Sequence, residues 1–398
     1  GENLTKGNNG MDAHIVGWGH TSFGRLDDSL EELISKAATE AIDHANLDPK
    51  DIDGIWIGHY NGGLVPDGFI SSLALQISPE LRFTPATRVE NACASGSAAV
   101  YAARDSIRAG TAKTTLVIGV EKMTAKDTKG VTEALMTASY QEEEGGVSFP
   151  HIFARYADAY FQVNGDKSEI LAKIAVKNHT NAIKNPLAQI QKNVNFDFCN
   201  NISDKNPMVA SPLRLTDCSL ISDGAAAVVM VSDDISHNFD RAVRFRAGVQ
   251  VNDFLPMSSR DILKFEGPTE AFKRAFTEAK ININNLDFAE VHDCFTMAEL
   301  LIYEAMGITK SGQGSRAISE GLVYSNGSLP INLSGGLKAK GHPVGATGVS
   351  MHALVAAQLC GEAGLMQKED ATLGCLFNMG GSGVANYCSI LEPVHNGN

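Results

Sequence analysis

A cysteine and a histidine, far apart in the chain, each stand on a loop of small residues in front of a predicted helix. Cys93 lies in Asn-Ala-Cys-Ala-Ser-Gly (91–96), and His342 lies in Gly-His-Pro-Val-Gly-Ala-Thr-Gly (341–348). Glycine and proline restrict the second loop, which would hold an imidazole in a fixed orientation. The first turn of a helix favours an anion, so we expect the Cys93 thiol to be biased toward thiolate. The pair predicts nucleophilic acyl transfer.

Two further segments follow predicted strands. Val-His-Asp-Cys-Phe (291–295) supplies His292 and Cys294, and Asn-Met-Gly-Gly-Ser-Gly (378–383) is rich in glycine. The glycine-rich segment is weak as a phosphate loop. The chain has neither G-x-x-x-x-G-K-S/T nor G-x-G-x-x-G before a helix, and it has no H-E-x-x-H. Nucleotide hydrolysis, dinucleotide binding and a zinc peptidase site therefore lack support.

Composition narrows the class of protein. The 398 residues include 33 basic and 46 acidic side chains, a net charge of −13, which argues against nucleic-acid and anionic-membrane binding. Seven scattered cysteines without a C-x-x-C pair indicate neither a disulfide framework nor a structural zinc site. With no apolar run long enough to span a bilayer and no signal peptide, we expect a cytoplasmic protein. Residues 1–10, polar and rich in Gly and Asn before Met11, are expected to be an added leader.

One structural unit occurs twice, at an offset of 234 residues. Each copy has an amphipathic helix, a short strand, one of the special loops, a helix of small residues and an apolar strand. In the first copy the predicted elements are a helix over 29–45, strand 55–57, helix 97–107 and strand 116–120. In the second they are a helix from 268, strand 286–291, helix 346–359 and strand 373–377.

The repeat predicts two α/β halves about a pseudo-twofold axis, because strand–helix–strand units favour right-handed crossovers and largely parallel sheets. The two helices rich in Ala, Gly and Ser are expected between sheets. The less periodic stretch between the halves is expected to be an inserted lid, with a helix over 168–184. The predicted segments are 11–121 (N-terminal half), 122–215 (inserted loop domain), 216–245 (return to the N-terminal half) and 246–398 (C-terminal half).

From about residue 13 to residue 393 the motifs resemble the thiolase superfamily, which implies a five-layer αβαβα fold. Cys93 in N-A-C-A-S-G looks like the acyl-accepting cysteine of that family, and His342 in G-H-P-V-G-A-T-G looks like the histidine that activates it. Many thiolases have Asn-Glu-Ala-Phe where this chain has His-Asp-Cys-Phe (292–295), and C-x-G where it has Asn-Met-Gly (378–380). His-Asp-Cys-Phe is characteristic of the sterol-carrier-protein type of thiolase.

This resemblance implies roles for the remaining residues. Cys294 would replace the missing thiol as general acid and base. His292 and His342 would line one oxyanion pocket, and the backbone N–H groups of Cys93 and Gly380 would form the other. The chain would cleave 3-ketoacyl-CoA with CoA, or condense acetyl-CoA units, by ping-pong acylation of Cys93. CoA and acyl-CoA would be substrates reached along the 122–215 segment, with no metal, no permanently bound cofactor, and a homodimer or homotetramer as the assembly.

Three alternatives stay open. A condensing enzyme of the ketoacyl synthase or HMG-CoA synthase type keeps the Cys and His but uses Asn or Glu partners, so Cys294 and the Gly-His-Pro loop speak against it. A non-catalytic thiolase-like subunit would have lost Cys93 or His342, and both are present. The third alternative is a partner-dependent acyltransferase or retro-aldol relative that works beside a small zinc-containing subunit.

Overall fold

The computed structural model describes residues 11–394, so the predicted leader, residues 1–10, lies outside the described residues. Its main strands are β1 (Ala13–His20), β2 (Gly54–Gly58), β3 (Ala86–Val89), β4 (Thr114–Lys122), β7 (Asp223–Ser232), β8 (Val243–Asn252), β9 (Phe288–Val291), β10 (Gly374–Gly380) and β11 (Ala385–Pro393). They form one nine-stranded sheet in the order β3-β2-β4-β7-β1-β8-β11-β10-β9. β1 and β8 pair at only two positions, so two half-sheets meet along a short seam.

The two half-sheets repeat one topology. The order β2-β4-β7-β1 in the first matches β9-β10-β11-β8 in the second. In each set the first pair is parallel and the next two pairs are antiparallel. Even β3, which pairs parallel with β2, has a counterpart in a single parallel bridge between Ala289 and Ile331. The predicted pseudo-twofold repeat is confirmed, but the largely parallel sheets expected with it are wrong, because two of the three pairs in each set are antiparallel.

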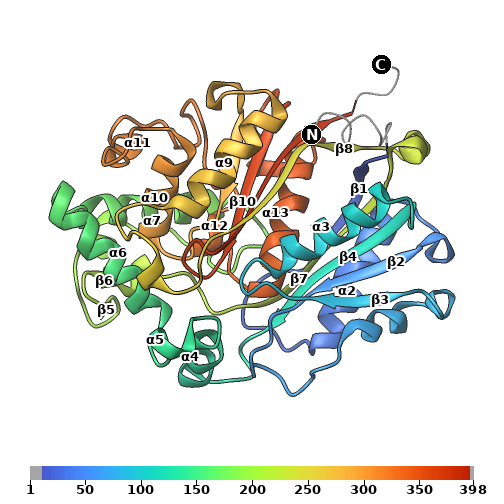
Figure 1. The fold of residues 1–398 in the computed structure, drawn as a ribbon, viewed down its shortest axis with the longest axis horizontal. Coiled ribbons are helices and arrows are strands. Elements are labelled where there is room, and N and C mark those ends of the chain that lie inside the picture. Colours follow the sequence, from blue (N-terminus) through green and yellow to red (C-terminus); the bar gives the residue numbers. More distant parts are fainter. Residues whose placement is uncertain (1–10, 395–398) are drawn as a thin grey trace.

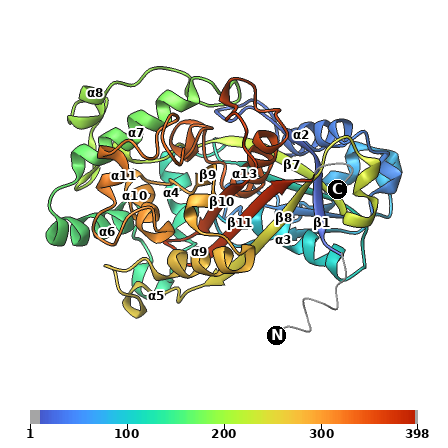
Figure 2. The same cartoon turned by 90° about the horizontal axis from the view of Figure 1, so that it is seen from above.

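Helices build layers on these half-sheets. They are α2 (Leu30–His44), α3 (Ser95–Arg108), α9 (Glu266–Ala279), α10 (Thr296–Met306) and α13 (Val344–Leu359). α3 and α13 pack on each other and on strands between the half-sheets, α2 covers β1, β4 and β7, and α9 covers β8 and β11 (Figures 1 and 2). Nearly every residue of α13 is buried, as expected for a helix without a polar face. The result is the predicted five-layer α/β fold.

Local sequence explains where these elements begin. Ser29 caps α2 and forms a capping box with Glu32, as its spacing predicts. The helix predicted from residue 268 begins two residues earlier, at Glu266. The helices predicted over 97–107 and 346–359 each begin two residues earlier than predicted, so both reach back to the special loops that carry Cys93 and His342.

The inserted segment lies between β4 and β7 and covers one end of the molecule, at the left of Figure 1. It contains α4 (Thr128–Met136), α5 (Gln141–Glu144), α6 (Phe149–Asn164), α7 (Ser168–Ala182), α8 (Phe196–Asn200), β5 (Met208–Ala210) and β6 (Leu213–Arg214). Two short helices, α11 (Ser315–Ser319) and α12 (Gly336–Ala339), complete the second half. The segment is thus more helical than its weak periodicity suggests, and the boundaries assigned to the four segments stay predictions.

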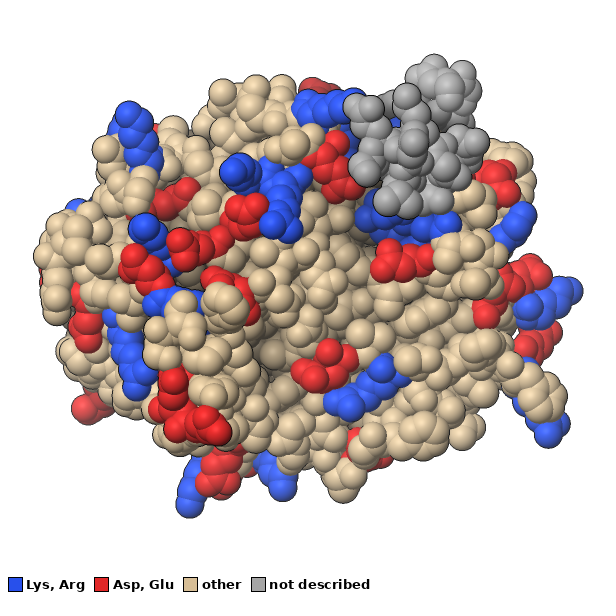
Figure 3. Space-filling view, in the orientation of Figure 1, with Lys and Arg blue, Asp and Glu red and all other residues tan. Residues whose placement is uncertain are grey.

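Charged side chains of both signs are interspersed around the face seen in Figure 3, and the middle of that face is mostly uncharged. None of the helices in residues 11–394 combines the length and apolar character that crossing a bilayer would require.

Candidate active site

Cys93 stands on a sharp turn between β3 and α3. The preceding residue, Ala92, has a φ of 54°, the left-handed conformation that costs energy for any residue with a Cβ atom. Hydrogen bonds hold this turn: the Asn91 N–H donates to Ser95 Oγ at 2.9 Å, and Asn91 Nδ2 donates to Tyr387 Oη at 2.8 Å. A strained, over-determined turn of this kind is typical of a functional residue.

The resting Cys93 thiol is protonated. Burial, reinforced by the negative charge of Glu121, raises the pKa of Cys93 to about 12, although a hydrogen bond from the Gly381 N–H opposes the shift. The expected bias toward thiolate at the helix start is therefore wrong, because desolvation of the sulfur and the nearby Glu121 charge both disfavour the thiolate. Glu121 is fully buried, and its carboxylate accepts backbone N–H groups from Tyr60, Asn61 and Gly345.

His342 begins the loop in front of α13. Its N–H donates to Ser222 Oγ at 2.9 Å, and its Nδ1 lies 2.6 Å from Thr347 Oγ1. Burial and the neighbouring ammonium of Lys340 lower the pKa of His342 to about 3. The ring is therefore neutral near pH 7 and keeps a lone pair on one of its two nitrogens.

His292 lies against His342, with ring centroids 5.0 Å apart and planes at 89°. Asn378 joins this pair to the cysteine loop, since its Nδ2 is 3.0 Å from His292 Nδ1 and 3.2 Å from the Cys93 carbonyl oxygen. Ser97 Oγ donates to Asn378 Oδ1 at 2.7 Å. Burial, then the proximity of His342, lowers the pKa of His292 well below its ordinary value. Asn378 is a site residue that the motifs did not predict, although it lies in the glycine-rich segment 378–383.

Cys294 is buried beside this group. Burial, followed by the charge that Cys93 would carry as a thiolate, raises the pKa of Cys294 well above its ordinary value. Its carbonyl oxygen accepts the Ser219 N–H at 3.0 Å. The next residue, Phe295, stacks on Phe153 of α6 with ring centroids 4.7 Å apart, so the inserted segment borders the site.

Asp293 ties the His-Asp-Cys-Phe loop to the loop that carries His342. Its buried carboxylate accepts the N–H groups of Leu337 at 2.7 Å and Lys338 at 3.2 Å, as well as Asn178 Nδ2 at 2.9 Å. A Cβ atom at Gly336 would collide with the same carboxylate. This interlock fixes the relative position of two loops that lie more than 40 residues apart in the chain.

Gly380, at the end of β10, lies against the turn before Cys93. A Cβ atom there would come within 2.6 Å of the Asn91 carbonyl oxygen. A cavity of about 400 Å³ adjoins this contact, and its walls include Ala92, Gly381 and residues 137–139 of the inserted segment. Within residues 11–394, no three His, Cys, Asp or Glu side chains are placed to hold a metal ion.

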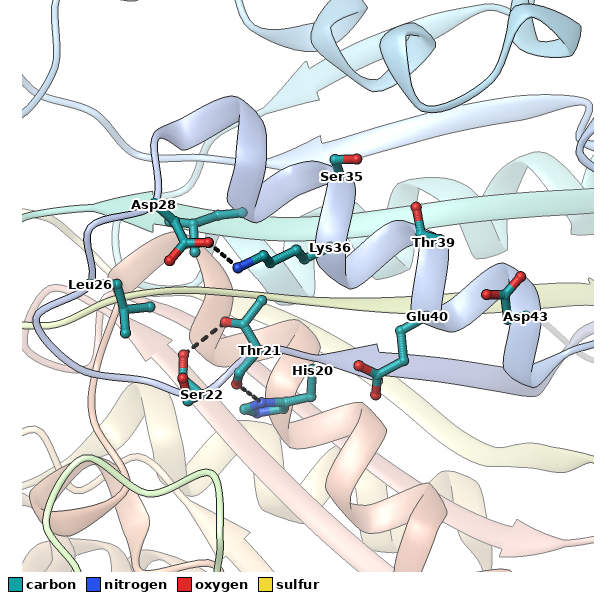
Figure 4. A pocket seen from close by; sticks show the side chains of 11 residues that line it. His20, Thr21, Ser22, Leu26, Asp28, Ser35, Lys36, Thr39, Glu40 and Asp43 are labelled. Carbon is teal, nitrogen blue, oxygen red and sulfur yellow. Dashed lines mark hydrogen bonds and ion pairs between the residues drawn. The ribbon is translucent and has the colours of Figure 1, made fainter.

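A second cavity, of about 650 Å³, lies between α2 and the loop after β1 (Figure 4). His20, Lys36 and Glu40 line it, and Lys36 Nζ bonds to Asp28. None of the predicted site residues lines this cavity. Away from this cavity, Asn378 joins the Cys93 loop to His292, and His342 packs against the His292 ring. Cys294 and Gly380 lie beside this group.

Comparison with known proteins identifies the family. A family model described as "Thiolase, N-terminal domain" matches residues 13–234, and one described as "Thiolase C-terminal domain-like" matches residues 249–393. The acetyl-CoA acetyltransferase of Methanothermobacter thermautotrophicus is 39% identical over 94% of this chain and 97% of its own. Human sterol carrier protein 2 is 32% identical over 92% of this chain and 69% of its own.

A solved structure described as "Ltp2-ChsH2(DUF35) aldolase" has the same fold, with a TM-score of 0.81 and 21% identity over 96% of this chain and 98% of its own. The chain belongs to the thiolase family. It is an acyltransferase of the thiolase type, as the motifs around Cys93 and His342 predict.

Proposed function

We propose that this thiolase cleaves a 3-ketoacyl-CoA with CoA, or in reverse condenses two acetyl-CoA molecules, with Cys93 as the nucleophile. The observation that carries the proposal is the meeting of Cys93 and His292 at one amide, Asn378, with a neutral His342 against the His292 ring. The relative named acetyl-CoA acetyltransferase favours acetoacetyl-CoA as the first substrate to test.

In the first half-reaction His342 accepts the Cys93 thiol proton while the sulfur attacks the keto carbon. The bond from that carbon to the α-carbon then breaks, and its electron pair becomes the enolate of acetyl-CoA. Cys294 gives its thiol proton to the α-carbon, and the acyl group stays on Cys93 as a thioester. Acetyl-CoA leaves, with His342 protonated and Cys294 a thiolate.

In the second half-reaction Cys294 takes the thiol proton of an incoming CoA. The CoA thiolate attacks the acyl carbon, the Cys93 thiolate leaves, and His342 returns its proton to that sulfur. The raised pKa of Cys294 suits this cycle, because its thiol is protonated at rest and becomes a strong base once deprotonated.

Oxygen carries negative charge twice in this cycle. We assign the enolate oxygen to His292 and His342, and the oxygen of the Cys93 thioester to the N–H groups of Cys93 and Gly380. Each donor would contribute about 3 kcal/mol to the transition state. Gly381, whose N–H faces the Cys93 sulfur, joins this second group.

CoA is a substrate in this proposal, with no permanently bound cofactor and no metal. The contact between Phe153 of the inserted segment and Phe295, next to Cys294, supports an approach of the pantetheine arm along residues 122–215. We expect a reducing, cytoplasmic compartment, which the seven free cysteines support.

The proposal also includes the oligomeric state of the protein and its need for a partner subunit. We expect a homodimer or homotetramer, which light scattering of the purified protein would measure. The aldolase of the same fold is described together with a DUF35 protein. That description keeps a small partner subunit, and with it retro-aldol chemistry, as the second candidate. Activity of the isolated chain on acetoacetyl-CoA would exclude the need for such a partner.

The test is thiolysis of acetoacetyl-CoA by the wild type and the variants Cys93→Ala, Cys294→Ala and Cys360→Ala. We expect Cys93→Ala to lose both turnover and acyl labelling. Cys294→Ala should still be acylated by acetyl-CoA but fail in carbon–carbon bond chemistry. Cys360 lies at the far end of α13 and should be dispensable. Acyl labelling that persists in Cys93→Ala would refute the assignment of the nucleophile.

A further inference from the structure

Within residues 11–394, Asn378 is the one polar side chain that hydrogen bonds to both the cysteine loop and the His292 ring. The orientation of its amide is fixed by the hydrogen-bonding capacity of its partners. A backbone carbonyl can only accept a hydrogen bond, so the atom 3.2 Å from the Cys93 oxygen must be the amide nitrogen. The Ser97 hydroxyl, 2.7 Å from the other end of the amide, agrees, because it donates to Oδ1. If the amide were flipped, Asn378 Oδ1 would face the Cys93 carbonyl oxygen, and neither oxygen could donate a hydrogen bond.

The same amide nitrogen lies 3.0 Å from His292 Nδ1. An amide NH₂ group donates and does not accept, so His292 Nδ1 must present its lone pair. A neutral imidazole has a single N–H, which must then sit on Nε2. The lowered pKa of His292 agrees with a neutral ring, since a protonated ring would turn an N–H toward the amide hydrogens.

The contacts of His342 favour the opposite tautomer, with the proton on Nδ1. Thr347 Oγ1 donates to the Pro343 carbonyl oxygen at 3.3 Å, so it accepts from His342 Nδ1 at 2.6 Å. The proton of His342 is then on Nδ1, and its Nε2 is free to accept. Among residues 11–394 no group hydrogen bonds to Nε2 of either ring, and neither Nε2 is fully enclosed. Two perpendicular rings thus offer one donor and one acceptor to the site.

We propose that Asn378 is a positioning residue that places the proton of neutral His292 on Nε2, so that this ring donates a hydrogen bond to a negatively charged substrate oxygen. The amide nitrogen achieves this while bound to the Cys93 carbonyl, so the tautomer of His292 and the position of the nucleophile loop are set by one group. The use of that hydrogen bond in turnover rests on the proposed function, whereas the tautomer itself does not.

The wild-type protein tests the tautomer directly, by long-range ¹H–¹⁵N NMR of protein labelled with ¹⁵N-histidine. The chain supplies its own standards. His20 and His352 each direct Nδ1 at a backbone carbonyl, at 2.6 and 2.7 Å, and must carry the proton there. His44 Nδ1 accepts the Trp18 N–H at 3.0 Å, so this nitrogen carries no proton in the neutral ring. We expect His292 to match His44, and a match to His20 would overturn the proposal.

The variant Asn378→Asp tests the cause. A carboxylate oxygen beside Nδ1 only accepts, so the His292 proton should move to Nδ1 and leave Nε2 without a hydrogen to donate. Thiolysis of acetoacetyl-CoA should fall by about 10²- to 10³-fold in kcat, the usual loss of one oxyanion donor, with a much smaller change in KM. The matched control is Asn386→Asp, since Asn386 is also a buried strand asparagine whose Nδ2 donates to backbone carbonyls, but it touches no histidine.

Each outcome decides a separate point. An unmoved His292 proton in Asn378→Asp, or an equal loss of turnover in Asn386→Asp, would overturn the role of Asn378. A proton that moves without any loss of turnover would keep that role and refute the assignment of His292 in the proposed function. If Asn378→Asp does not fold, the wild-type spectrum still decides the tautomer.

Discussion

Gly380→Ala is the substitution whose effect on catalysis follows most directly from close packing in the site. The new Cβ would lie 2.6 Å from the Asn91 carbonyl oxygen, about 0.8 Å inside an ordinary contact of 3.4 Å. Gly380 pairs with Ala385 on the neighbouring strand, which holds the end of β10 in place. The displacement therefore falls mainly on the turn that carries Cys93. A shift of about 1 Å in a reacting group costs on the order of 100-fold in rate.

The assay is single-turnover acylation of Cys93 by acetyl-CoA together with thiolysis of acetoacetyl-CoA, each normalised to folded protein. The control is Gly374→Ala at the opposite end of the same strand, where the added Cβ would come within 2.6 Å of the Phe288 ring. Both variants should lose stability, but only Gly380→Ala should lose about 100-fold in acylation. Acylation within threefold of the wild type in Gly380→Ala, or an equal loss in both variants, would show that the contact of Gly380 with Asn91 does not position Cys93.

Two further predictions concern buried charge. Glu121→Gln removes the negative charge that helps to raise the pKa of Cys93, so the pH profile of Cys93 alkylation by iodoacetamide should shift to lower pH. The same change leaves one backbone N–H poorly satisfied and should lower the unfolding free energy by about 1–3 kcal/mol. An unshifted alkylation profile would contradict the electrostatic role of Glu121. Burial lowers the pKa of His20 to about 3 in the folded protein, so between pH 6.5 and 3 the unfolded chain binds more protons and stability falls as the pH falls. His20→Gln, which keeps a hydrogen-bond donor and an acceptor, should remove about 1.4 kcal/mol of this loss of stability per pH unit. Urea unfolding of the wild type and the variant at pH 7 and pH 5 measures the difference. An identical pH dependence of stability in the two proteins would show that His20 is not buried as a neutral ring.

Much of the fold was predictable because it depends on local patterns that occur twice. The capping box at Ser29, the small-residue helices and the apolar strands are each encoded within a window of a dozen residues. The offset of 234 residues then predicts the two-half topology, which the matching strand orders confirm. Little of this depends on contacts between remote segments.

The details of the site were less accessible, because they depend on remote contacts. The helix start predicts a thiolate at Cys93, but the burial and the Glu121 carboxylate that reverse this bias come from the packing of β4. Asn378 stood out only as part of a glycine-rich segment and as the residue in place of the cysteine of C-x-G, and its hydrogen-bond partners lie 86 and 285 residues away in the chain. The interlock of Asp293 with the N–H groups of Leu337 and Lys338 has no signal in either motif alone.

The claim that Cys93 holds the acyl group is tested most directly by mass spectrometry of the intact protein after incubation with acetyl-CoA, followed by peptide mapping. We expect the added mass of a single acetyl group, confined to the peptide that contains Cys93, and no added mass in Cys93→Ala. An acetyl group on the peptide that contains Cys294, or on any other cysteine, would contradict it.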